Sequence, residues 1–81
     1  MLREILTLTV NQVPIQYYIR FGKDRKRFTF HPTFKNKDAP EFVILVKDSE
    51  LKIAGEIEEQ MAEQAKEKVR EIISNSIFDS F

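Results

Sequence analysis

The sequence predicts a small α+β fold in which an antiparallel sheet of four or five strands, arranged as a meander, packs on one C-terminal amphipathic helix. Apolar and polar residues alternate through the first half of the chain, as in strands with one buried face. Turn-forming residues interrupt this alternation at short intervals. After about residue 56 the apolar residues recur every three or four positions, which is the period of a helix.

Length and composition limit the class of protein. A chain of 81 residues can close one hydrophobic core, so we expect a single domain over residues 1–81. Hydrophobic residues make up 42% of the chain and charged residues 32%, which is typical of a globular protein. The absence of cysteine excludes disulfides and favours a reducing compartment. The sequence has neither the pattern of a secretory signal nor an apolar run that could span a bilayer, so we expect a cytoplasmic protein without a membrane partner.

Three strands are expected in the first half of the chain, over residues 3–10, 13–21 and 26–34. Asn11-Gln12 suits a two-residue turn between the first two strands, because Asn tolerates the positive φ of such turns. Residues 22–25 supply the next turn. The alternation predicts that one apolar set faces the core: Leu6, Leu8, Val10, Val13, Ile15, Tyr17, Ile19, Phe21, Phe28, Phe30 and Phe34.

A fourth strand is expected over residues 41–47, and it departs from the alternation. Every position from Phe42 to Val46 is apolar, so the strand has apolar side chains on both faces. If Phe42, Ile44 and Val46 face the helix, Val43 and Leu45 face away from it.

The segment after the fourth strand has two interpretations. In the one that we prefer, Asp48-Ser49 turns the chain, and residues 50–54 return as a fifth strand before a helix over residues 56–78. In the other, Ser49 caps a helix that begins at Glu50. The longer helix would place Gly55 in its interior, at a cost of about 1 kcal/mol relative to alanine.

The C-terminal helix has one apolar side and one charged side. Its apolar residues lie at helical spacing: Ile57, Met61, Ala65, Val69, Ile72, Ile73 and Ile77. Its charged residues take the opposite side: Glu58, Glu59, Glu63, Lys66, Glu67, Lys68 and Arg70. The apolar side needs a partner, and the phenylalanine-rich face of the sheet is the large candidate.

Charges cancel over the whole chain but not along it. Thirteen basic and thirteen acidic residues give a net charge of zero, so no overall field attracts nucleic acid. Residues 1–37 carry a net charge of +6, and the remainder carries −6. This separation fits a partner that approaches from one side, but we prefer the simpler interpretation, in which a sheet and a helix merely differ in charge.

No constellation of residues indicates catalysis. Without cysteine, a Cys-His pair is excluded, and a Ser-His-Asp arrangement would have to use the only histidine, His31. Two isolated glycines cannot form a phosphate-binding loop, and the helix glutamates are dispersed as on a solvated surface. We therefore expect no catalytic residue, no metal site and no cofactor.

The basic segment over residues 20–27 is the strongest local feature. Guanidinium groups beside stacking side chains are typical of proteins that bind single-stranded nucleic acid. A hairpin tip that is kept soluble by charge has the same composition. The candidate residues for contact with nucleic acid or an anion are Tyr18, Arg20, Lys23, Arg25, Lys26, Arg27 and His31.

The outward side chains Val43 and Leu45 form a candidate strip for self-association, because exposed apolar strips on sheets often mark interfaces. The sequence thus leads to two hypotheses. In the first, the chain is a non-catalytic interaction or accessory module that binds a protein partner or forms a homodimer through the sheet. In the alternative, it binds single-stranded nucleic acid weakly through residues 20–27.

Overall fold

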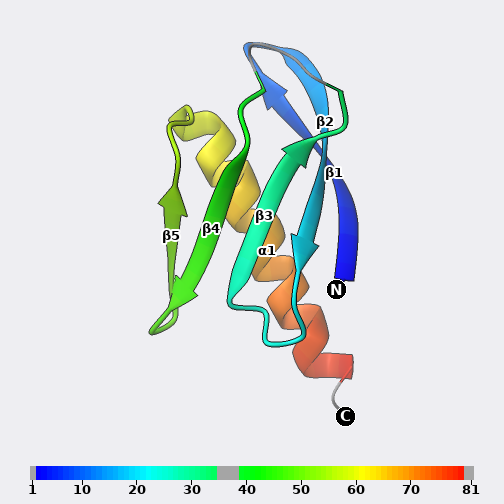
Figure 1. Cartoon of the computed structure of the whole chain (residues 1–81), viewed down its shortest axis with the longest axis vertical. Helices are drawn as coiled ribbons and strands as arrows, with labels where there is room; N and C mark the ends of the chain where they lie inside the picture. Colours follow the sequence, from blue (N-terminus) through cyan, green and yellow to red (C-terminus); the bar gives the residue numbers. More distant parts are fainter. Residues whose placement is uncertain (1, 35–38, 80–81) are drawn as a thin grey trace.

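The computed structural model describes residues 2–34 and 39–79 (Figure 1). The five strands form one antiparallel sheet in the order β1-β2-β3-β4-β5, and the helix packs on one face of this sheet. This arrangement confirms the predicted fold class. The elements are β1 (Leu2–Val10), β2 (Val13–Phe21), β3 (Arg27–Pro32), β4 (Phe42–Lys47), β5 (Glu50–Ala54) and α1 (Glu59–Asp79).

Two tight turns set the register of the outer hairpins. Asn11 and Gln12, between β1 and β2, have φ values of 49° and 67°. Asp48 and Ser49, between β4 and β5, have nearly the same values, 52° and 67°. Positive φ at both central residues gives a turn whose twist matches that of the strands. The second turn confirms the interpretation in which residues 50–54 form a strand.

The helix begins later than the prediction of residue 56. Gly55 has a φ of 131°, and a Cβ at this position would lie 3.1 Å from Cβ of Phe42. Glycine therefore lets the chain turn closely past β4 as it leaves the sheet edge. Residues 56–58 then cross from the sheet to the helix layer, with Ile57 packed against the core, and α1 starts at Glu59.

β3 is shorter than the predicted strand over residues 26–34. It ends at Pro32, which lies opposite Tyr17, and the last contact with β2 comes from Thr33, whose amide donates to the Gln16 carbonyl at 3.0 Å. The prediction that Phe34 faces the core is wrong, because the chain has left the sheet and the side chain is 79% exposed. Val13, which was also expected inside, is 54% exposed at the hairpin end.

The core lies between the sheet and α1. Phe30 and Phe42 stack at its centre, with ring centroids 4.6 Å apart and planes at 11°. Helix and sheet are thus joined by one continuous apolar layer, in which each strand except β5 has buried side chains. The buried residues are Leu8, Val10, Ile15, Tyr17, Ile19, Phe21, Phe28, Phe30, Ala39, Phe42, Ile44, Met61, Ala65, Val69 and Ile72. Ile77, which was predicted on the same side of the helix, lies outside the side chains that the structure describes.

The helix follows β1 and also covers part of its edge. The side-chain amide of Gln64 accepts from the Thr9 amide and donates to the Thr9 carbonyl, both at 2.9 Å, as a neighbouring strand would. Further along, Lys68 pairs with Glu4 at 3.2 Å. These contacts fix α1 against β1 and occupy one of the unpaired positions on this edge. Within the described residues, no helix is both long and apolar enough to cross a lipid bilayer.

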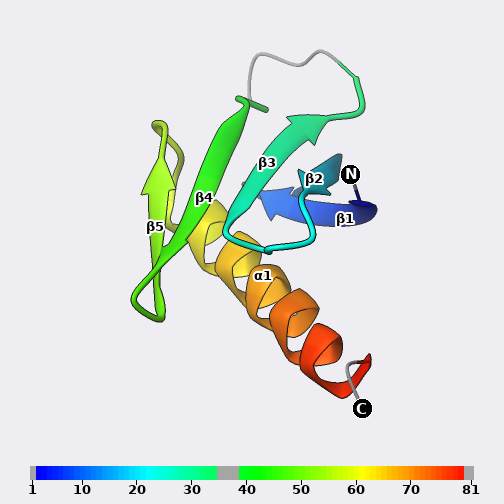
Figure 2. The ribbon, with the colours of Figure 1, turned by 60° about the horizontal axis from the view of Figure 1, so that its bottom comes forward.

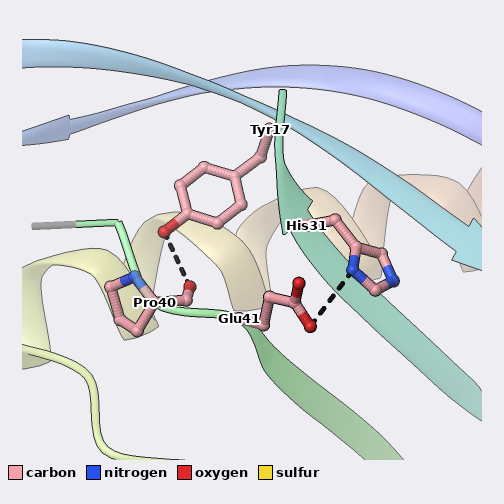
Figure 3. Close-up of polar contacts among 4 residues, drawn as sticks. All are labelled: Tyr17, His31, Pro40 and Glu41. Atoms are coloured by element: carbon pink, nitrogen blue, oxygen red, sulfur yellow. Dashed lines mark hydrogen bonds and ion pairs between the residues drawn. The ribbon is translucent and has the colours of Figure 1, made fainter. Parts of the chain in front are cut away.

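Tyr17 joins the core to the segment before β4. Its side chain is fully buried, and its hydroxyl donates a hydrogen bond to the Pro40 carbonyl at 2.9 Å (Figure 3). Burial raises the pKa of Tyr17 from 10.0 to about 12, because the charged phenolate would be poorly solvated there. The folded chain therefore holds this proton more firmly than the unfolded chain does.

This difference predicts a loss of stability in alkali. The contribution of the Tyr17 proton is complete below pH 10.0 and disappears as the pH rises through about 12. We expect the melting temperature of the wild type to fall more steeply across this window than that of Tyr17→Phe, because the variant has no hydroxyl to ionise. The other ionisable groups are the same in the two proteins, so their contributions to the pH dependence cancel in the comparison. Parallel curves from thermal melts between pH 8 and 11.5 would contradict this assignment.

Candidate binding surface

The face of the sheet opposite α1, here called the open face, has no other described element over it (Figure 2). Residues paired across antiparallel strands share a face, and successive residues alternate between faces. The register therefore places on the open face Arg3, Ile5, Thr7, Thr9, Pro14, Gln16, Tyr18, Arg20, Arg27, Thr29, His31, Val43, Leu45, Lys47, Glu50, Lys52 and Ala54.

The open face is predominantly basic. Its basic residues are Arg3, Arg20, Arg27, Lys47 and Lys52. Glu50 is the acidic residue that the register places on this face, and Glu41 lies just before β4, with its Oε2 3.4 Å from His31 Nδ1. The outer side of α1 instead exposes Glu59, Glu63, Glu67 and Glu71. Basic side chains therefore outnumber acidic ones on the open face, whereas α1 exposes these glutamates together with Arg70.

The predicted basic cluster divides into two groups. Arg20 and Arg27 line a cavity of about 350 Å³ on the open face, here called the arginine cavity. Its lining residues are Arg20, Phe21, Gly22, Asp24, Arg27, Thr29 and His31. Lys23, Arg25 and Lys26 instead line a second hollow, which also includes Val46 of β4 and Ile73 of α1.

This division follows from the turn between β2 and β3. Arg25 has a positive φ of 51°, and its amide donates to the Gly22 carbonyl at 3.1 Å. Its guanidinium donates to the Lys23 carbonyl at 3.0 Å and lies 6.0 Å from the centre of the Phe21 ring, a residue of the core side. Alternation along a strand does not continue through such a turn, so the sequence could not assign these three residues to a face.

Tyr18 and His31 lie together at the centre of the open face. Their rings stack with centroids 5.0 Å apart and planes at 23°. The Arg3 guanidinium lies 5.4 Å from the Tyr18 ring centre, and Glu41 Oε2 lies 3.4 Å from His31 Nδ1 (Figure 3). Because β1 and β3 flank β2, Tyr18 has a partner on each side. Its ring is therefore partly occupied by neighbours rather than fully available to a ligand.

Arg3 and Glu41 were missed as members of this group. The alternation around Thr7 and Thr9 could have placed Arg3 on the same face, since all three positions are odd-numbered in one strand. Glu41 had no such signal. Its contact with His31 depends on how the loop before β4 brings the chain back beside β3, which local patterns do not contain.

Val43 and Leu45 lie on the open face, next to the arginine cavity. Val43 is opposite Thr29, and Leu45 is opposite Arg27. Val43 is half-buried, whereas Leu45 is 40% exposed. These two residues, here called the apolar strip, thus border the basic residues directly.

Among the described residues, no three His, Asp or Glu side chains are gathered closely enough to hold a metal ion. The open face presents cations, one aromatic stack and an apolar strip. Comparison with models of known families, with curated proteins and with solved structures found no match to this chain.

Proposed function

We propose that this chain is a non-catalytic interaction module that binds an acidic region of a partner protein through its open face. The observation that carries the proposal is a sheet face without cover from the described residues, on which Arg27 adjoins Leu45 of the apolar strip and Arg20 lies one strand further away, opposite Thr29. Arginine and aromatic side chains are enriched at protein interfaces. A cytoplasmic setting fits this proposal, since the chain has no cysteine that an oxidising compartment would pair.

The two parts of the surface have different expected roles. Leu45 can be desolvated by a partner, and burial of such a side chain provides affinity. The arginines accelerate encounter with an acidic surface and select its orientation. His31, the single histidine, is already stacked on Tyr18 and paired with Glu41, which supports a structural role for it.

Site-specific photo-cross-linking in the cells that produce the protein tests this proposal. A benzoylphenylalanine replaces Lys52 on the open face or, as the control, Glu67 on the outer side of α1. We expect discrete protein adducts from position 52 and not from position 67. Arg20→Glu with Arg27→Glu should abolish the adducts from position 52. Equal adducts from both positions, or adducts that persist after charge reversal, would contradict the proposal.

The apolar strip gives a separate prediction. Leu45→Lys should remove the adducts from position 52 while leaving the helix content unchanged, because a 40% exposed side chain contributes little to the core. Circular dichroism checks the fold. Light scattering of the wild type and the variant tests whether the partner is a second copy of this chain. A concentration-dependent dimer that Leu45→Lys dissociates would identify the strip as a homodimer contact. Unchanged adducts would remove the strip from the binding surface.

Single-stranded nucleic acid is the second candidate. It is favoured by the position of Tyr18 and His31 among Arg3, Arg20 and Arg27 on one exposed face. Binding of this kind must weaken steeply with salt and must depend on the stacking group. Fluorescence anisotropy with a labelled ten-nucleotide oligothymidylate, at low and moderate salt, measures both effects. The candidate fails if Tyr18→Ala binds as well as the wild type.

A further inference from the structure

The arginine cavity combines cationic side chains from two strands around one position. Arg27, Thr29 and His31 follow each other at alternate positions of β3, so they share the open face and are spaced about 7 Å apart along the strand. Arg20 lies directly across from Thr29 on β2. Thr29 therefore lies between the two arginines in the lining of the cavity, with Arg20 opposite it on β2 and Arg27 two residues before it on β3.

Both guanidinium groups are available to a ligand. Neither Arg20 nor Arg27 forms an ion pair or a side-chain hydrogen bond with the residues that the structure describes, and both residues are exposed. Each guanidinium offers a planar set of N–H donors that fits two oxygens of one anion. The apolar strip lies on β4, with Leu45 opposite Arg27 and Val43 opposite Thr29.

The remaining lining residues shape the cavity. His31 forms one wall and is held in place by the Tyr18 ring and by Glu41. Asp24 is the acidic member of the lining, and its Oδ1 accepts a hydrogen bond from the Lys26 amide at 3.4 Å. Two arginines against one aspartate leave the cavity cationic. Asp24 lowers this charge, so its removal should strengthen the binding of an anion.

From this geometry we infer that the arginine cavity is a binding site for a phosphate group carried by a partner protein. The inference rests on the proposed function and specifies the chemistry of the partner. A phosphate monoester carries nearly two negative charges and three acceptor oxygens, which match two guanidinium groups and one hydroxyl. A single carboxylate could be satisfied by one of the arginines alone.

Nuclear magnetic resonance titration of the full chain with inorganic phosphate, at constant ionic strength and with acetate as the reference anion, tests the inference. Phosphate should shift the amide resonances of Gly22 and Thr29 in a saturable manner, and acetate should not. Arg20→Gln with Arg27→Gln should weaken binding at least about tenfold, the loss typical of hydrogen bonds to charged groups. Asp24→Asn should tighten it.

Lys23→Gln with Lys26→Gln is the matched control. It removes the same charge from the same hairpin, but its residues line the other hollow. We expect it to bind phosphate as the wild type does. If both double variants lose binding equally, or if acetate produces the same shifts, the cavity has no specific site and the inference is wrong. Circular dichroism of each variant separates loss of binding from loss of fold.

A second titration identifies the source of the phosphate. N-acetyl-phosphoserine amide should bind at the same residues as inorganic phosphate, and N-acetyl-serine amide should not. Binding of oligothymidylate in preference to phosphoserine would overturn the inference in favour of nucleic acid. If cross-linked adducts form at the open face but phosphate does not bind, the phosphate inference is wrong and the proposed function stands. Phosphate and phosphoserine binding without protein adducts would support the site and contradict the proposed function.

Discussion

Phe30→Ala is expected to lower the free energy of unfolding by about 3–5 kcal/mol, the range for removing a large aromatic side chain from a core. Phe30 is fully buried and stacks on Phe42 at 4.6 Å, so the substitution leaves a cavity where strands and helix meet. Small domains are marginally stable, often by only 5–15 kcal/mol. Urea denaturation followed by circular dichroism should therefore show a transition shifted to much lower urea, or a chain that is already partly unfolded.

Phe34→Ala is the matched control for this result. It makes the same chemical change two positions beyond β3, where the phenylalanine is 79% exposed. We expect a change within about 0.5 kcal/mol, as for surface substitutions elsewhere. Similar losses at positions 30 and 34 would mean that β3 continues to residue 34 and that the described end of the strand is wrong.

Ala65→Glu should prevent α1 from packing on the sheet. Ala65 is fully buried, and a glutamate there would introduce both excess volume and an unpaired charge into the core. Each effect alone costs about 1–3 kcal/mol or more, so we expect loss of the cooperative thermal transition. The measurement is a thermal melt together with binding of a dye that recognises exposed apolar surface.

Ala62→Glu tests whether this effect belongs to the buried side of the helix. Ala62 lies three residues earlier on the same helix and is half-buried. The substitution keeps helix propensity and adds the same charge, so we expect a much smaller loss of stability than at position 65. Equal destabilisation at the two positions would contradict the described orientation of α1.

Much of the sheet could be predicted from local patterns, because a strand with one buried face must alternate. The alternation around Leu8 and Ile15, for example, indicates which face of the sheet each side chain occupies. The turn at Asp48-Ser49 also follows from local preference, since such residues tolerate positive φ. The pattern does not say where a strand ends. Phe34 continued the alternation after the chain had left the sheet.

The binding surface could be predicted only in part. Arg20 and Arg27 lie within regular strands, so their face follows from their position. Lys23, Arg25 and Lys26 lie in or beside a turn, where a positive φ redirects the chain. The pairing of His31 with Glu41 needs the return of the chain beside β3, which is a tertiary property. The sequence therefore predicted one cluster of basic residues, whereas the fold places these residues in two separate hollows.

Calorimetric titration with the partner that photo-cross-linking identifies tests the central claim most directly, namely that the open face is the binding surface. Arg20→Glu with Arg27→Glu should weaken binding about a hundredfold or more, as expected for two charge-assisted contacts. Lys23→Glu with Lys26→Glu reverses the same charge within the same hairpin but on the other hollow, and should bind nearly as the wild type does. Equal weakening by the two variants would show that only overall charge matters, and would contradict a binding surface on the open face.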